Sequence, residues 1–174
     1  LEKDDYHDVF FVYGPDYAPW CIDICMLSYM ANELKNEIVP PGMFGFIGFD
    51  KDKQINWKEG MVTKEHITKV INDFIKKNNA MIELFTESQR TEYNAKLHDY
   101  FGPFVGKRWI ELSEFLVKNV SSWDSYAISV VYLYLIKDFE LNKLDIKVPN
   151  WKSYKTLLEN MVLSSPDERK TSTD

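Results

Sequence analysis

The stretch Ser121–Ile136, SSWDSYAISVVYLYLI, decides the fold class that the sequence predicts. Serines at its start can cap a helix, and apolar side chains follow on nearly every side. A helix that faces solvent normally carries a polar stripe opposite its apolar one, and this stretch has none. We therefore expect a helix that is buried on all sides. Asp124, near its start, is the one acidic residue in the stretch.

Amphipathic patterns on both sides of this stretch predict further helices. Thr63 and Thr86 are good N-cap residues, and Gln89 would complete a capping box with Thr86. Prolines and glycines between residues 39 and 61 indicate a loop or a short hairpin. The helices expected besides the central one are Pro19–Asn36, Thr63–Asn78, Thr86–Phe101, Lys107–Asn119 and Asn150–Met161. The predicted fold is mostly α with little or no sheet, in a single helical domain over residues 1–174.

The last residues, SSPDERKTSTD, have the pattern of a helix start. Serine can serve as the cap, Pro166 suits the first helical position, and acidic residues suit the first turn. The sequence ends before a helix body could follow. We therefore expect the chain to be a fragment of a longer one.

Composition narrows the function classes. The 174 residues carry a net charge of −6, which argues against nucleic acid as a partner. No apolar run approaches the roughly 20 residues that a membrane span needs, and the charged start LEKDDYHD is no signal peptide. Cys21 and Cys25 lie four residues apart, a spacing unsuited to a disulfide within one helix. We expect both to be buried free thiols in a protein that is not secreted.

Local motifs for metal binding or catalysis are incomplete. Asp50–Glu59, DKDKQINWKE, resembles a calcium loop but lacks its glycine and places its glutamate two positions early. The cluster Asp4–Asp8 could bind a hard cation, although such acidic runs are commonly solvated. His66 and His98 lie on amphipathic helices without an evident nucleophile. The sequence predicts no metal site, no cofactor site and no catalytic residue within this chain.

Two parts of the chain resemble the C-terminal lobe of protein kinases. In Asp124–Ser129 an aspartate precedes an apolar helix, as in the helix that runs through the middle of that lobe. Leu157–Leu158 and the Pro-x-x-Arg-x-Thr pattern from Pro166 to Thr171 resemble the end of the lobe. More specifically, Tyr100–Ile136 and Tyr13–Met30 are similar to serine/threonine kinase-like proteins of large cytoplasmic DNA viruses. In that group, inserted helices precede the central helix, and the resemblance covers residues 6–172.

The resemblance implies structural roles for two residues. Asp124 would be the aspartate that anchors the catalytic loop from beneath. Arg169 would be the arginine that pairs with the glutamate closing the activation segment. If Tyr17–Trp20, YAPW, is that closing segment, Trp20 stands where the glutamate belongs. The ion pair would then be missing or rebuilt with another acid.

Phosphoryl transfer needs parts that this sequence does not contain. It has no glycine-rich phosphate loop, no nucleotide-binding lysine motif, no His-Arg-Asp and no Asp-Phe-Gly. Leu97–Gly102, LHDYFG, includes His and Asp but not the accompanying arginine or asparagine. ATP and magnesium are therefore expected only with upstream sequence.

Two functions follow as expectations. The first is the C-lobe portion of a viral serine/threonine kinase or kinase-like protein, which scaffolds a catalytic loop and offers a protein-substrate surface. The second is a noncatalytic virion structural or interaction module, built on a degenerate kinase-like or an unrelated all-α fold. Both place the protein in the host cytoplasm or the virion, with a protein substrate or a virion protein as partner.

Overall fold

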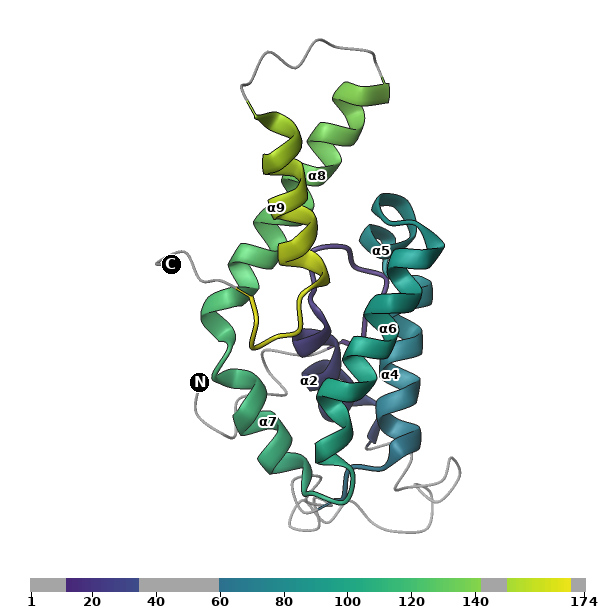
Figure 1. Ribbon diagram of the computed structural model, residues 1–174. Coiled ribbons are helices and arrows are strands. Elements are labelled where there is room, and N and C mark those ends of the chain that lie inside the picture. Colours follow the sequence, from purple (N-terminus) through teal and green to yellow (C-terminus); the bar gives the residue numbers. More distant parts are fainter. Residues whose placement is uncertain (1–11, 35–59, 142–149, 170–174) are drawn as a thin grey trace.

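The computed structural model describes residues 12–34, 60–141 and 150–169. These ranges form seven α-helices and no sheet, with one isolated antiparallel bridge between Met61 and Arg108. The all-α prediction is therefore confirmed for the described chain (Figure 1). The helices are α2 (Ile22–Asn32), α4 (Lys64–Lys77), α5 (Asn79–Leu84), α6 (Glu87–Phe101), α7 (Trp109–Val117), α8 (Trp123–Leu141) and α9 (Trp151–Leu163), with 3₁₀ turns η3 (Gly102–Phe104) and η4 (Val120–Ser122).

Side-chain caps set several helix boundaries where the sequence predicts them. The Thr63 hydroxyl accepts a hydrogen bond from the His66 backbone N–H at 3.2 Å, which begins α4. Thr86 and Gln89 form the expected capping box of α6. Asn78 ends α4 and also caps α5, because its Oδ1 accepts from the next helix's first amides. The sequence analysis did not predict α5.

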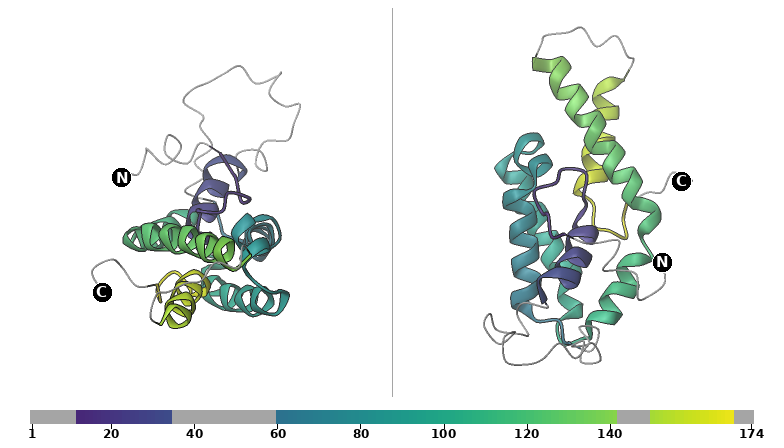
Figure 2. Two further views of the ribbon diagram at one scale, coloured as in Figure 1. Left: turned by 90° about the horizontal axis from the view of Figure 1, so that it is seen from above. Right: turned by 180° about the vertical axis from the view of Figure 1, so that it is seen from behind.

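Helix α2 is the buried helix of this fold. It packs against α4 and α7 (Figures 1 and 2). Nine of its eleven residues are buried, including Asp23 and Ser28. Cys21 and Cys25 are free and fully buried, as the sequence predicts. An almost entirely apolar helix is stable here because neighbouring elements remove its surface from water on several sides.

Helix α8 is not buried on all sides, so that prediction is wrong. Tyr126, Val130 and Leu133 point into the core, but Ile128 and Val131 are 55% and 52% exposed. Helix α8 pairs with α9 in an antiparallel hairpin that projects beyond the other helices (Figure 1). The hairpin covers one side of α8, and nothing among the described residues covers the other.

The chain after α9 turns instead of beginning a helix within the described residues. Ser164 ends α9, and Pro166–Glu168 form a turn in which the Glu168 N–H donates to the Ser165 carbonyl at 3.0 Å. Asn150 precedes α9 in a left-handed conformation with φ 60° and makes no side-chain cap. The helix expected from Asn150 onwards thus begins at Trp151, without a side-chain hydrogen bond from Asn150.

Candidate functional site

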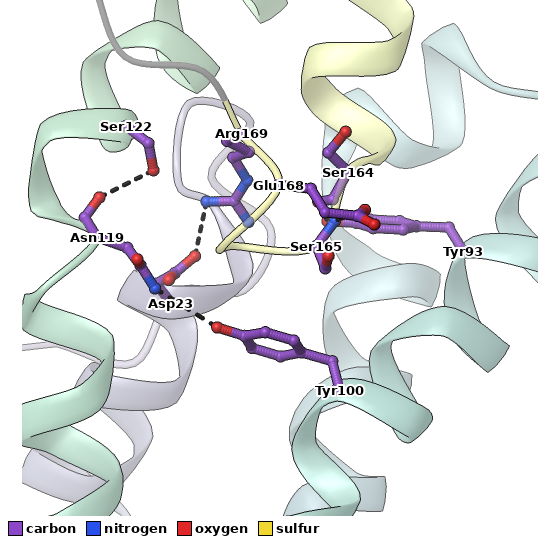
Figure 3. Close-up of polar contacts among 9 residues, drawn as sticks. All are labelled: Asp23, Tyr93, Tyr100, Asn119, Ser122, Ser164, Ser165, Glu168 and Arg169. Atoms are coloured by element: carbon purple, nitrogen blue, oxygen red, sulfur yellow. Dashed lines mark hydrogen bonds and ion pairs between the residues drawn. The ribbon is translucent and has the colours of Figure 1, made fainter.

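A buried ion pair joins the two ends of the described chain. Nη1 of Arg169 donates to Oδ2 of Asp23 at 2.7 Å, and both side chains are fully inaccessible to solvent. The two residues lie 146 positions apart in the sequence. Figure 3 shows the guanidinium lying directly over the first turn of α2. Such a contact fixes the end of the chain against its buried helix.

Local structure explains how each partner reaches this position. Asp23 belongs to the first turn of α2, where a carboxylate also interacts favourably with the positive end of the helix dipole. The turn after α9 brings Arg169 back towards the core. This turn is held by the Ser165 N–H, which donates to Glu168 Oε2 at 3.4 Å, and Lys96 of α6 lies 3.6 Å from that same oxygen.

Two tyrosines from two further helices surround the pair. The Cζ atom of Arg169 lies 5.3 Å from the ring centroid of Tyr126 in α8, a cation–π distance. Tyr93 of α6 donates its hydroxyl to the Ser164 carbonyl at 3.3 Å, just before the turn. Four segments therefore meet at one guanidinium: α2, α6, α8 and the chain after α9.

The surroundings of the pair keep nearby tyrosine and cysteine side chains neutral, but they keep Arg169 charged. Burial raises the pKa of Tyr93 to about 12 and that of Cys21 to about 12, and it also raises the pKa of Tyr126 well above its ordinary value. Burial also opposes the charge of Arg169. Neighbouring acidic groups, Asp23 foremost, nevertheless hold its pKa well above the ordinary value. Arg169 therefore carries its positive charge across the physiological pH range.

Several polar atoms of this cluster lack hydrogen-bond partners among the described residues. They are Oδ1 of Asp23, Nε and Nη2 of Arg169, and the hydroxyl oxygen of Tyr126. A buried charge is tolerated only when it is paired, and unsatisfied buried atoms are costly. The pair thus satisfies half of the Asp23 carboxylate and leaves the other oxygen able to accept one more hydrogen bond.

The sequence-predicted residues separate into one inside this cluster and one outside it. Arg169 is in the cluster. It pairs with Asp23, an acid that lies three residues after the Tyr17–Trp20 segment and outside it. Trp20 contacts the Tyr17 ring at 5.7 Å between centroids. Asp124 is exposed in the first turn of α8 and does not belong to the cluster.

Sequence reasoning missed Asp23, although a signal was present. Asp23 is the one charged residue in the largely apolar run from Cys21 to Met30, and a charge inside such a run requires a partner. Asp124 carries the same signal at the start of the other apolar stretch.

The remaining candidate residues do not assemble a catalytic or metal site in the described chain. Nδ1 of His66 accepts from the Thr63 N–H at 3.2 Å, so this histidine serves the cap of α4. His98 lies in the last turn of α6. Among the described residues no three His, Cys, Asp or Glu side chains gather closely enough to hold a metal. The stretches Asp4–Asp8 and Asp50–Glu59 lie outside the described residues.

The concave features of the described surface are open depressions between helices. One of about 370 Å³ lies between α6 and α9, with Tyr93, Lys96 and Asn160 among its lining residues. Another of about 400 Å³ lies between α4 and α6, lined in part by Lys76 and Arg90. Neither contains the buried pair, and neither has the apolar enclosure typical of small-molecule sites.

The outer side of the α8–α9 hairpin presents a row of large apolar side chains to solvent. Each is between 43% and 55% exposed. We call this surface the α8–α9 face, and its residues are Ile128, Val131, Tyr132, Leu135, Phe139, Tyr154 and Leu157. The rings of Tyr132 and Tyr154 contact each other at 6.2 Å between centroids, which connects the two helices' parts of the face.

Comparisons with known proteins add no family: no family model, no curated protein and no solved structure matches the chain. Among the described helices, none combines the length and hydropathy required to cross a bilayer.

Proposed function

We propose that the chain is the helical lobe of a protein kinase-like protein, in which α2 is the central helix and Asp23 is its anchor aspartate. The observation that carries the proposal is the buried pair between Asp23 and Arg169. In the kinase resemblance, Arg169 pairs with a glutamate, and Trp20 stands at that position in this chain. If the ion pair is kept, another acid near Tyr17–Trp20 must bind Arg169. Asp23, three residues after Trp20, occupies that place.

Burial supports moving the role of the central helix from α8 to α2. The resemblance implies an apolar helix that is covered on all sides and has an aspartate near its start. Nine of the eleven residues of α2 are buried, and Asp23 lies in its first turn. Helix α8 has the aspartate, but Asp124 and one whole side of that helix are exposed.

The unpaired oxygen of Asp23 supports the anchoring role. Oδ1 is buried and has no hydrogen-bond partner among the described residues. In the kinase-like reading, a backbone amide of the catalytic loop supplies that partner. The loop, the nucleotide and the magnesium ion would all come with upstream sequence, and this chain would add the scaffold and a protein-substrate surface. The viral resemblance places this activity in the host cytoplasm or the virion.

The test compares two aspartates in the full-length protein that the gene encodes. Asp23→Asn keeps the size of the side chain but removes its charge, and Asp124→Asn makes the same change at an exposed site. We expect magnesium–ATP to raise the melting temperature of the longer protein, and serine/threonine phosphorylation to fall with Asp23→Asn only. Loss of activity with Asp124→Asn alone would return the anchor to α8. Upstream sequence without kinase motifs, or no response to magnesium–ATP, would contradict the catalytic role.

A noncatalytic interaction module is the second candidate, and the α8–α9 face favours it. Monomeric proteins rarely expose so many large apolar side chains on one surface. A longer protein that ignores magnesium–ATP but loses a stable complex when Leu135 becomes glutamate would support this candidate. An unchanged complex in that variant would contradict it.

A further inference from the structure

The exposed side chains of α8 form a straight apolar row. Ile128, Val131, Leu135 and Phe139 follow at intervals of three or four residues, so they lie one above another along the helix. Tyr132 widens the row towards α9. The opposite side of α8 packs into the core, so the row is a second apolar side beyond the one that folding buries.

The area of the face matches that of a protein–protein interface. Seven side chains that are about half exposed offer on the order of 100 Å² each, or roughly 700 Å² together. A standard stable interface buries about 800 Å² per partner, and the largest apolar patch of a typical monomer is about 300–600 Å². The face is therefore close to the size that one partner contributes to a stable complex.

The chemistry of the face suits a second copy of the same chain. None of its seven residues is charged, so two copies brought face to face do not place like charges at the centre. Homodimer interfaces are also more apolar than other interfaces. A two-fold axis through the middle of the row would lay the two α8 helices against each other in antiparallel orientation.

We infer that the α8–α9 face is a homodimer interface, in which α8 packs against α8 of a second copy. This inference deepens the interaction-module candidate by naming its partner. It is independent of the kinase-like role, because the face contains neither Asp23 nor Arg169. A kinase-like protein could dimerise in this way, and a noncatalytic one could as well.

The first experiment measures mass in solution by sedimentation velocity over a wide range of protein concentration. We expect a dimer for the natural chain and a monomer for Leu135→Glu, whose side chain is already 48% exposed and needs no core space. Val105→Glu is the matched control, since Val105 is 46% exposed but lies outside the face. Circular dichroism and melting temperature show whether each variant remains folded. A monomeric natural chain, or a Leu135→Glu variant as dimeric as the natural one, would overturn the inference.

A second experiment uses single introduced cysteines. Both natural cysteines are fully buried, so an exposed new one is the reactive thiol of a folded chain. We expect Val131→Cys or Leu135→Cys to form a disulfide-linked dimer on mild oxidation and Val105→Cys to remain monomeric. Equal cross-linking at all three sites would indicate random collision. A dimer of this chain that is absent from the longer protein would assign the face to another segment and would also overturn the inference.

Discussion

Helices α2 and α8 are almost equally apolar, and neither has a polar stripe, yet one is buried and the other is half exposed. Helices α4 and α7 pack against α2 and nine of its eleven residues are buried, whereas α8 lies in a projecting hairpin that covers one of its sides. An apolar composition therefore indicates that a helix needs other elements to cover it, but it does not indicate which elements these are. Helix α2 finds its partners within the chain. The second apolar side of α8 finds none among the described residues.

The largest effect is expected where α2 carries its charge. Asp23→Ala leaves Arg169 buried and uncompensated, which should lower the free energy of unfolding by about 3–5 kcal/mol. Urea denaturation measures the loss. The double variant Asp23→Ala with Arg169→Met should lose less than Asp23→Ala alone, because it leaves no unpaired charge. Additive losses in the double variant would show that the two residues do not act as a pair.

The difference in burial between α2 and α8 is tested by making the same substitution, leucine to alanine, in both helices. Leu27 of α2 is 1% exposed, so Leu27→Ala should cost about 2–5 kcal/mol of unfolding free energy. Leu135 of α8 is 48% exposed, so Leu135→Ala should change the stability of the monomer by no more than about 0.5 kcal/mol. Both values come from thermal or urea unfolding at a concentration where the chain is monomeric. Similar losses at the two sites would mean that α8 is as buried as α2.

A medium effect is expected at Asn78, which holds the approach to α2. Its Oδ1 accepts from the Ala80 and Met81 amides, and its Nδ2 donates to the Tyr17 carbonyl at 3.0 Å. Asn78→Ala should cost about 2 kcal/mol, because it removes a helix cap and leaves buried groups unpaired.

The matched control for Asn78 is Thr86→Ala, which removes an exposed cap and should cost about 1 kcal/mol. Hydrogen exchange of the α2 amides should increase in the Asn78 variant only. Unchanged exchange in α2 would show that Asn78 stabilises α5 alone.

The smallest effect at neutral pH is expected at Tyr126, where α8 meets the buried pair. Its hydroxyl has no hydrogen-bond partner among the described residues, so Tyr126→Phe should be nearly neutral at pH 7. The effect should appear in alkali. Burial raises the pKa of Tyr126 above its ordinary value of 10.0 in the folded state, so folding favours the neutral phenol.

The stability that comes from burying the neutral Tyr126 phenol is fully present below pH 10. It is lost as the pH rises above 10 towards the folded-state pKa of Tyr126. Tyr126→Phe should therefore lose less stability than the natural chain between neutral and alkaline pH. Tyr93, whose pKa rises to about 12, still titrates in both proteins, so part of the alkaline loss should remain. Identical pH profiles for the two proteins would contradict this role of Tyr126.

Much of the fold was predictable because its signals are local. Thr63 and Thr86 begin their helices as expected, since a cap depends on residues within one turn. Helix α5 was missed because its six residues are too few for periodicity to reveal them. The local pattern at Pro166 predicted a helix start, but Pro166–Glu168 form a turn in the described chain. This turn places Arg169 against the buried Asp23.

Of the two residues in the buried ion pair, only Arg169 was predictable from the sequence. Arg169 stands in a recognisable motif, and the sequence even allowed that its partner had been replaced. Which acid replaced it depends on a contact across 146 residues, and no local pattern encodes such a contact. Asp23 and Asp124 look alike in sequence, since each lies beside an apolar helix. Tertiary packing separates them by burying the first and exposing the second.

The sequence by itself determined that this protein is helical, where most of its helices begin, and that the helix after Ser121 is apolar on nearly every side. These properties follow from side-chain spacing and capping, which act within a few residues. Only the tertiary structure decided which apolar helix is enclosed, which aspartate pairs with Arg169 and which surface stays open to solvent. Those outcomes depend on how distant segments pack together, which no local pattern of the sequence encodes.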